Sequence, residues 1–435
     1  MLTFSSENNK VSPQQNKRYS DRLVPYIKHL QEVAKSKKYL APESSIVLPN
    51  DSHAIKQVQR LAQTMSSRSL KYVIVIGIGG SNLGAKAVYD ALYGHTDAYM
   101  LDRSPKLICL DTCDSASLES VVEYLKKNIT SEDEYIINVI SKSGATTETA
   151  ANMAYLFQAS AKKLPKFNSR IVLTTDRGSA LWELGKEKDY PTLEMPKQVG
   201  GRYSVFSAVG LFPLACLGID IGKLCKGAQW SIKQGLSERT DSNSSAMSAI
   251  ALVNYYSKGG RIHDTFFFAP ALETVGKWYR QLFAESLGKV PSNSKTREAI
   301  SITPTVSIGS TDLHSMAQLY LANPSSRFTT FVSVKNSAHS QRLEASDWTN
   351  LVQGLKGQTM FGLMSTIYRG VVNTYTSKKM PFITIEMKEY SEFVLGALMQ
   401  MKMLEVMFCA HLLGVNAFDQ PHVELYKKEV RKLLE

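Results

Sequence analysis

Tyr72-Val-Ile-Val-Ile76, followed directly by Gly77-Ile-Gly-Gly-Ser-Asn-Leu-Gly84, decides the fold of this 435-residue chain. The first stretch is a short, continuously apolar run rich in β-branched residues. The second is a glycine-rich turn that leads into a helical pattern from Asn82 to Leu92. An apolar strand closed by such a turn and a helix is typical of a parallel sheet that helices cover on both faces.

The same pattern returns along the chain. Further apolar runs occur in the first half at 106–110, 135–140 and 170–174. The second half repeats the pattern with runs at 264–269, 328–334 and 382–386, and a helix is expected over 274–287. Strands that alternate with helices in two series predict an α/β fold built from two three-layer sandwiches with parallel sheets.

Both ends of the chain are expected to be helical. The N-terminal part reads as helix interrupted by prolines, including Pro25, and the last part as helices over 393–413 and from Pro421 onward. The stretch 393–413 contains Lys402, Glu405 and His411, which favours a buried amphipathic helix over a membrane span. We therefore expect an N-terminal helical segment (1–50), a first sandwich that includes the glycine-rich turn (51–225), a second sandwich (226–390) and a C-terminal helical arm (391–435).

Composition narrows the function classes. The net charge is +12, but the basic residues are dispersed, without the basic–aromatic interleaving that binds nucleic acids. A nucleic-acid partner therefore rests on charge alone. Five cysteines in no CxxC spacing and eight histidines without HxxxH predict reduced thiols and no metal site. Residues 1–20 are polar and lack the apolar core of a secretory signal, so we expect a cytoplasmic protein.

The glycine-rich turn after residue 76 is suited to an anion. Glycines let backbone amides approach a ligand closely, and the start of the following helix adds its positive end. Two alternatives remain for this turn. It resembles a dinucleotide fingerprint, but Asn82 replaces the third glycine and the acid Asp111 comes about 30 residues on rather than about 20. It could also be a tight turn without a ligand.

A second loop, Ser141-Lys-Ser-Gly-Ala-Thr-Thr-Glu148, also follows an apolar strand and opens a helix. Four hydroxyl groups, one ammonium and free helix-start amides converge within eight residues, which suits a phosphate monoester. The order Gly-Lys-Ser/Thr of a nucleotide-binding loop is absent. The alternative is plain helix capping by a hydroxyl with Glu148 as its partner.

These two loops resemble the phosphate loops of the glucose-6-phosphate isomerase family. Four more blocks match that family in the same order, so the resemblance runs from about residue 70 to the C-terminus. They are Gly201-Arg-Tyr-Ser-Val-Phe-Ser207, Ala284-Glu-Ser-Leu-Gly-Lys289, Thr311-Asp-Leu-His314, and Phe418-Asp-Gln-Pro-His-Val-Glu424 followed by Lys427. The resemblance implies two sandwiches of the sugar-isomerase (SIS) type and the interconversion of an aldose phosphate and a ketose phosphate, without a cofactor.

Such an isomerisation needs a base, a group that stabilises an enediolate, and an acid–base pair that opens the sugar ring. Glu285 is the candidate base, because it ends a predicted helix among apolar neighbours, and Gln281 lies one turn before it. A solvent-facing glutamate is the alternative. Arg202 follows two glycines and offers a permanent charge for the enediolate, with a structural ion pair as the alternative.

The resemblance assigns the remaining roles. It gives ring opening to His314, working across a dimer interface, and to Lys427; from the residues alone, His314 reads more often as a structural or surface histidine, and Lys427 as a surface lysine on a terminal helix. It therefore implies a homodimer, whose partner ligand is a small sugar phosphate. The substrate-binding set that it implies is Gly80, Ser81, Ser141, Lys142, Ser143, Thr146, Gln281 and Gln420.

The sequence departs from the family at His422, where the family carries glycine. We expect a side chain there to crowd the loop that positions Gln420 and Lys427. Two other functions stay open: a phosphomannose or dual-specificity isomerase of related fold, and a sugar-phosphate-binding protein without catalysis. The stereochemistry at C2 cannot be read from the residues.

Overall fold

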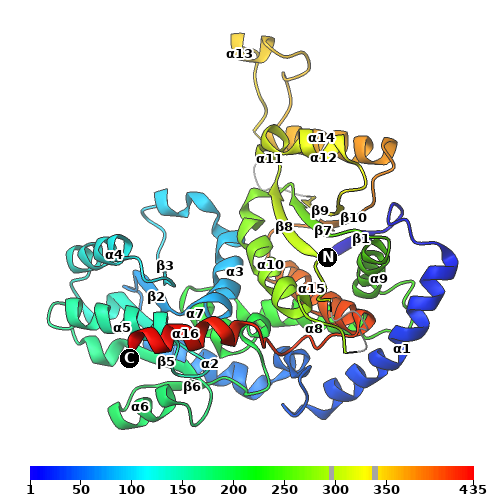
Figure 1. Ribbon diagram of the computed structural model, residues 1–435. Helices are drawn as coiled ribbons and strands as arrows, with labels where there is room; N and C mark the ends of the chain where they lie inside the picture. The colour runs from blue at the N-terminus through cyan, green and yellow to red at the C-terminus, as the bar shows by residue number, and fades with distance from the viewer. Residues whose placement is uncertain (293–297, 336–340) are drawn as a thin grey trace.

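The computed structural model describes residues 1–292, 298–335 and 341–435, and within them the chain forms two five-stranded sheets flanked by helices (Figure 1). The expected α/β fold is confirmed. The domain boundaries at 50, 225 and 390 stay predictions.

The first sheet is parallel throughout, in the order β3-β2-β4-β5-β6. Its strands are β2 (Tyr72–Ile76), β3 (Lys106–Leu110), β4 (Tyr135–Ile140), β5 (Ile171–Thr175) and β6 (Thr192–Glu194). Strands β2, β4 and β5 are buried along their whole length, which explains their uninterrupted apolar sequences. The chain leaves β2 toward β3 on one side and later returns to β4 on the other. A crevice for ligands is expected at that reversal, outside the carboxyl ends of β2 and β4.

The second sheet has the order β1-β10-β9-β7-β8 and repeats the same arrangement. Its parallel strands are β7 (Ile262–Phe267), β8 (Thr303–Ile308), β9 (Phe328–Val334) and β10 (Phe382–Met387); β1 (Leu2–Ser5) pairs antiparallel with β10. The sequence did not predict β1, β6 or β8. Strand β8 contains Pro304 and lies at the edge of the sheet, where a strand tolerates a missing amide donor.

Helices connect and cover these strands. Around the first sheet they are α2 (Ser52–Met65), α3 (Leu83–Tyr93), α4 (Ser115–Asn128), α5 (Thr147–Ser160), α6 (Ala180–Lys188) and α7 (Ala208–Cys216). The second half adds α8 (Ile221–Gly235), α9 (Ser244–Ser257), α10 (Glu273–Leu287), α11 (Thr311–Ser315), α12 (Ala317–Ala322), α13 (Asp347–Asn350) and α14 (Met360–Ser377). Figure 1 shows α13 and its flanking loops projecting from the body beyond α14.

The N-terminal helix α1 (Pro13–Ser36) continues through Pro25 as one helix, so the expected break there is wrong. Pro25 is exposed, and the buried side chains of Leu23, Ile27 and Leu30 pack on the core around it. Proline inside a helix costs about 3 kcal/mol, and burial of three large apolar side chains offsets that cost.

Helix α15 (Glu392–Leu413) lies in the interior, with nearly every residue buried, and so is not the amphipathic helix expected. By length and composition it could cross a membrane, but 94% of its most apolar window is buried inside the protein. Its two buried charges pair with each other, because Lys402 Nζ lies 2.8 Å from Glu405 Oε2. The interior position of α15 explains its long apolar sequence without a membrane.

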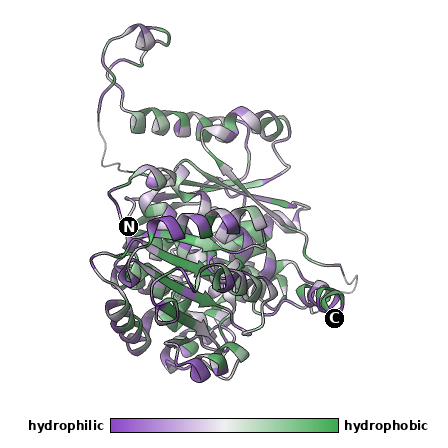
Figure 2. Ribbon diagram, turned by 90° about the vertical axis from the view of Figure 1, so that its left-hand side faces the viewer, coloured by the Kyte–Doolittle hydropathy of each residue, from purple (hydrophilic) through white to green (hydrophobic). Residues whose placement is uncertain are grey.

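The last helix, α16 (Val423–Leu434), has no buried residue. In Figure 1 α16 lies across the first sandwich, and in Figure 2 it lies at one side of the molecule. The strands in Figure 2 are mostly hydrophobic.

Candidate active site

The two predicted phosphate loops lie side by side at the reversal of the first sheet. A Cβ on Gly77 would lie 2.9 Å from the carbonyl oxygen of Ile140, the residue before the second loop. The first loop continues as the single turn η3 (Gly79–Ser81), which Ser81 ends. Asn82 Nδ2 donates to Asp111 Oδ2 at 3.1 Å. The two residues that depart from the dinucleotide fingerprint thus bind each other and tie the loop to the end of β3.

The second loop is fixed by a hydrogen bond from the end of β5. Thr175 Oγ1 donates to the Ser141 carbonyl at 2.6 Å, and the buried Ser141 hydroxyl lies 2.9 Å from Thr146 Oγ1. Thr146 starts α5 without a side-chain capping bond, so helix capping does not explain these hydroxyls. Ser143 is exposed. The loop therefore presents hydroxyl groups beside a helix N-terminus, as an anion site requires.

Lys142 connects the second loop to the segment that carries Arg202. Its Nζ donates to the carbonyl of Val199 at 3.0 Å. Burial lowers the pKa of Lys142, Asp176 partly opposes this, and the charge of Arg202 lowers the pKa further. An anion bound nearby would compensate the partly desolvated ammonium.

Gly80 connects the first loop to the same segment. A Cβ on Gly80 would lie 2.2 Å from the carbonyl carbon of Gly201, a distance that no real Cβ adopts. Gly201 begins the turn η7 (Gly201–Tyr203), so the backbones of the loop and of this turn are in direct contact. Glycine at 80 is therefore required by this close approach, and the contact fixes the turn that carries Arg202 against the phosphate loop.

The Arg202 guanidinium uses all five of its N–H groups. The side chain is only 2% exposed. Its acceptors are Ser286 Oγ (2.8 Å), Glu285 Oε2 (3.2 Å), Gln420 Oε1 (3.3 Å), and the carbonyls of Ala417 (2.6 Å) and Asp419 (3.0 Å). Arg202 thus joins η7, α10 and the segment before α16. A buried charge is retained where every donor is satisfied, as here.

Glu285 stands on the last turn of α10, and its two carboxylate oxygens receive different donors. Gln281 Nε2 donates to Oε1 at 2.9 Å, and Arg202 donates to Oε2. The carboxylate stays partly exposed, at 28% of its side chain. The predicted proximity of Gln281 and Glu285 on one helix face is thus observed. A Cβ on Gly79 would lie 3.0 Å from Gln281 Nε2, which places this pair directly over the first loop. Within the part of the chain that the structure describes, the buried Gln281 Oε1 has no hydrogen-bond partner.

Two residues of the cluster were not singled out from the sequence. Ser286 accepts from Arg202 and lies 3.1 Å from the Tyr203 hydroxyl. Lys289 is buried, donates to the carbonyl of Asn416 and lies 2.8 Å from Asp419 Oδ1. Burial lowers the pKa of Lys289, an effect that its hydrogen bond to Asp419 opposes. Both residues belong to the block 284–289, but nothing in their local pattern distinguishes them from surface residues.

His314 and Lys427 form no bond with this cluster in the described part of the chain. His314 is exposed in α11, and Lys427 pairs with Glu424 on α16 at 2.9 Å. Among the described residues, no hydrogen bond or ion pair joins either side chain to Glu285 or Arg202. Neither side chain therefore belongs to the hydrogen-bonded cluster around Arg202 as the described residues form it.

His422, the departure from the family, has φ −72° and ψ −26°, a conformation open to any residue. The residue is exposed, so the side chain adds no backbone strain at the start of α16.

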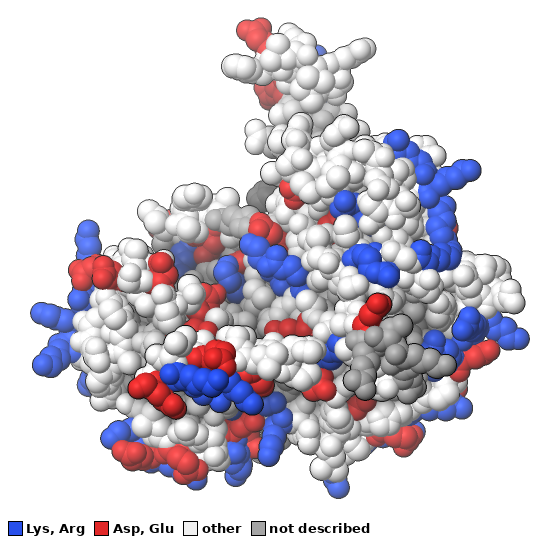
Figure 3. All heavy atoms as spheres, in the orientation of Figure 1, with Lys and Arg blue, Asp and Glu red and all other residues white. Residues whose placement is uncertain are grey.

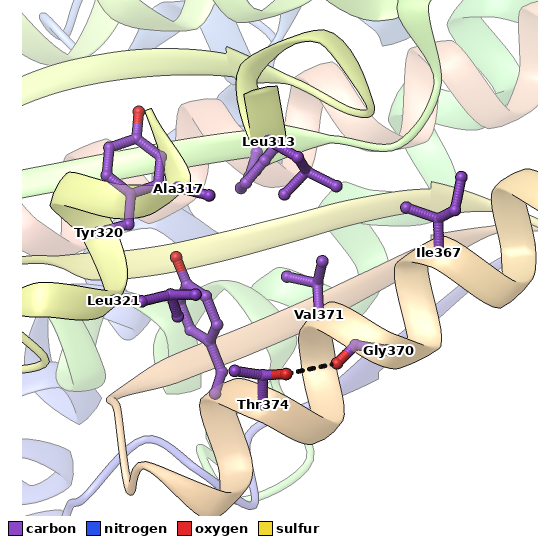
Figure 4. A pocket seen from close by; sticks show the side chains of 10 residues that line it. Leu313, Ala317, Tyr320, Leu321, Ile367, Gly370, Val371 and Thr374 are labelled. Carbon is purple, nitrogen blue, oxygen red and sulfur yellow. Dashed lines mark hydrogen bonds between the residues drawn. The ribbon is translucent and has the colours of Figure 1, made fainter. Parts of the chain in front are cut away.

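An apolar cavity of about 160 Å³ lies elsewhere, between α12 and α14 (Figure 4). Its lining side chains include Leu313, Leu321 and Val371 and carry no charge. Such a cavity does not suit a phosphorylated ligand. In the part of the chain that the structure describes, no group of three or more His, Cys, Asp or Glu side chains could hold a metal ion.

Comparisons with known proteins agree with this arrangement. The profile of the phosphoglucose isomerase family matches residues 21–435. A glucose-6-phosphate isomerase of Mycoplasmopsis synoviae (strain 53) is 33% identical over 391 residues, which cover 88% of this chain and 87% of that protein. One from Methanocaldococcus jannaschii is 32% identical over 386 residues, 86% of this chain and 87% of that protein.

Two solved structures share the whole fold. The crystal structure of a hypothetical protein from Thermus thermophilus matches with a TM-score of 0.84 and 25% identity over the full length of both chains. A glucose-6-phosphate isomerase from Chlamydia trachomatis matches with a TM-score of 0.79 and 18% identity, covering 100% of this chain and 88% of that one. The family profile and the curated relatives span the two loops and the Arg202–Glu285 cluster alike, and the chain belongs to the phosphoglucose isomerase family.

Proposed function

We propose that this protein interconverts glucose 6-phosphate and fructose 6-phosphate by opening the sugar ring and moving a proton through a cis-enediol intermediate. The observation that carries the proposal is the Gln281–Glu285–Arg202 cluster, which lies directly against the first, glycine-rich loop in a chain of this family. The second, hydroxyl-bearing loop lies beside the first and bonds to the segment before Arg202 through Lys142. A carboxylate, a fixed positive charge and an anion site in contact are what such a reaction needs.

The phosphate group occupies the reversal of the first sheet. Ser81, Ser141, Ser143 and Thr146 offer hydroxyl donors there, and Lys142 adds its charge. The depressed pKa of the partly buried Lys142 supports this assignment, because a bound dianion stabilises the protonated ammonium. The backbone contact at Gly80 holds this anion site at a constant distance from the turn of Arg202.

Glu285 then moves the proton. Its carboxylate takes the proton from C2 of the open-chain aldose, which leaves an enediolate with its charge on the oxygen of C1. The hydroxyl proton of C2 passes to that oxygen, and the carboxyl group returns its own proton to C1. The product is the ketose, with all atoms and protons conserved.

Arg202 stabilises the enediolate charge. Its five N–H groups already have acceptors, so the guanidinium can act as a fixed positive charge. Alternatively, Arg202 gives up its hydrogen bond to the amide oxygen of the exposed Gln420 and donates to the substrate oxygen instead. The unpartnered Gln281 Oε1 is free to accept from a sugar hydroxyl. Electrostatic groups held ready in this way stabilise developing charge without reorganisation.

Ring opening is assigned to Lys427 and to His314 of the partner subunit, in a homodimer. The exposed position of His314, apart from the cluster of its own chain, supports a role in another chain. The projecting segment around α13 exposes large apolar side chains, with Trp348 at 79% and Leu351 at 74%. Exposed apolar surface of this kind is typical of a protein interface, and a second copy of the chain is the partner we propose.

The deciding experiment is a coupled assay of glucose 6-phosphate and fructose 6-phosphate interconversion, with no added cofactor or metal and with a chelator present. We expect turnover in both directions at undiminished rate. A parallel assay with mannose 6-phosphate tests the dual-specificity alternative, since the chemistry at C2 is otherwise the same. Absence of turnover with glucose 6-phosphate would refute the proposal, and equal turnover of both aldoses would replace it with the alternative.

We also propose that the enzyme works in the cytoplasm, without a nucleic-acid or membrane partner.

Size-exclusion chromatography with light scattering tests the proposed homodimer. A monomer that retains full turnover would refute a site shared between two subunits.

A further inference from the structure

A second hollow, of about 520 Å³, lies away from the Glu285 cluster at the amino ends of three strands of the second sheet. It is formed by the segments that lead into β7, β9 and β10, together with the loop between β1 and α1. No residue of the proposed active site lines it. The size falls within the range of small-ligand pockets.

Of the described residues, four basic ones and no acidic one line this hollow: Lys10, Lys258, Arg261 and Lys379. Among the described residues, none of the four forms an ion pair with a carboxylate. Lys258 Nζ donates to the carbonyl of Lys10 at 3.1 Å, and an Arg261 Nη1 group donates to the carbonyl of Gly260 at 2.9 Å. Lys258 is thus held to the segment of Lys10 by a neutral backbone group, and the cations that line the hollow have no carboxylate among the described residues to balance them.

Two residues that line the hollow carry buried polar atoms without a hydrogen-bond partner among the described residues. Asn254 is 1% exposed, and while its Nδ2 donates to the Lys10 carbonyl at 3.2 Å, its buried Oδ1 has no partner. The hydroxyl of Ser326, also in the lining, is buried and unpartnered as well. Buried polar atoms are nearly always satisfied, so these two point to a ligand that supplies the missing bonds.

The basic side chains and the unpartnered polar atoms would bind two different chemical groups of one ligand. Four cations suit a phosphate dianion. The Asn254 acceptor needs a donor, which a phosphate dianion lacks and a hydroxyl group has. Figure 3 shows that Lys and Arg also outnumber Asp and Glu on the surface of the second sandwich beside the end of α14.

We propose that this hollow is a second ligand site that binds a small, hydroxyl-bearing phosphate ester. Lys10, Lys258, Arg261 and Lys379 hold the phosphate, and Asn254 and Ser326 bind the hydroxyl-bearing part. Because the hollow shares no residue with the proposed active site, it binds its ligand whether or not the isomerase reaction is confirmed.

Equilibrium binding of glycerol 3-phosphate to the full-length protein tests the proposal, with inorganic phosphate as the comparison. We expect wild-type protein to bind one more molecule of the ester per chain than the Arg261→Gln/Lys379→Gln variant, in which the site is weakened about 100-fold by loss of two charged contacts. Inorganic phosphate should bind the same site more weakly than the ester. Unchanged stoichiometry in the variant would overturn the proposal.

A charge-matched control excludes a general effect of net charge. The Lys56→Gln/Lys378→Gln variant removes two exposed lysines outside the hollow, and one of them is the neighbour of Lys379. It should bind the ester as wild type does. Equal weakening in both double variants would show diffuse attraction to a basic surface and refute a built site. Ser326→Ala removes an unpartnered hydroxyl, so it should weaken ester binding while leaving phosphate binding intact; equal affinities for wild type and Ser326→Ala would refute the hydroxyl contact.

Discussion

Gly80 and Gly201 are in contact, but replacing each of them with alanine should have different effects. Alanine at 80 should disturb the structure, whereas alanine at 201 should be tolerated. A Cβ on Gly80 would lie 2.2 Å from the carbonyl carbon of Gly201 and 2.6 Å from the amide nitrogen of Arg202. Both are backbone atoms, which cannot turn away as a flexible side chain does. A Cβ on Gly201 would lie 3.7 Å from the Cα of Gly80, which is ordinary contact. Gly80→Ala and Gly201→Ala thus form a matched pair.

The magnitude follows from the displacement. Because ordinary contact begins at 3.4 Å, Gly80→Ala must separate the two backbones by about 1.2 Å. A misplacement of about 1 Å in a catalytic arrangement costs on the order of 100-fold in rate. Overpacking of this kind also lowers the free energy of unfolding by about 1–3 kcal/mol. We therefore expect kcat/KM of Gly80→Ala to fall about 100-fold, with stability reduced but the fold retained.

Steady-state kinetics with fructose 6-phosphate and thermal unfolding of both variants provide the measurement. Gly201→Ala should stay within about 0.5 kcal/mol of wild type, as an uncrowded substitution does, and should keep most of its activity. Equal behaviour of the two variants, whether both active or both inactive, would refute the idea that the close approach at Gly80 positions the Arg202 turn.

Three further outcomes follow from the same geometry. Arg202→Lys should lose about 3 kcal/mol of unfolding free energy in chemical denaturation, because three ammonium donors cannot satisfy five partly buried acceptors; wild-type stability would contradict this. Lys289→Met should raise KM more than it lowers kcat in steady-state assays, because the buried ammonium holds the carbonyl of Asn416, in the loop that leads to Gln420. An unchanged KM would contradict this role. Burial lowers the pKa of His263 well below 6.5, so the unfolded chain binds a proton there that the folded protein does not. The free energy of unfolding should therefore fall below pH 6.5, with a slope that His263→Gln reduces by up to about 1.4 kcal/mol per pH unit; an identical slope in the variant would contradict this.

For β2, β3, β4 and β9 the predicted bounds match the observed ones. Three of these strands are buried on both faces, where apolar residues leave an uninterrupted signal, and the edge strand β3 is half-buried but keeps an apolar run. Edge strands β1 and β8 escaped prediction because one is very short and the other carries proline and polar residues. The break expected at Pro25 was wrong, because tertiary packing outweighed the local preference.

The site was predictable only where the signal is local. Gln281 and Glu285 share one helix face, and each phosphate loop follows its strand directly, so spacing alone could place them. The contacts of Arg202 with residues 417–420 and the anchoring role of Lys289 join segments far apart in the chain. No pattern in a single sequence reports such contacts. The roles proposed for His314 and Lys427 depend in addition on a second subunit.

Exchange of hydrogen with solvent tests the proton-shuttling role of residue 285 most directly. Fructose 6-phosphate is incubated in D₂O with wild type or with Glu285→Gln, and deuterium in the recovered sugar phosphates is followed by NMR, while ligand affinity is measured separately. We predict that wild type introduces deuterium at C1 and C2, and that the variant binds the sugar phosphate as well but slows exchange by several orders of magnitude. Exchange at the wild-type rate in Glu285→Gln would contradict the account.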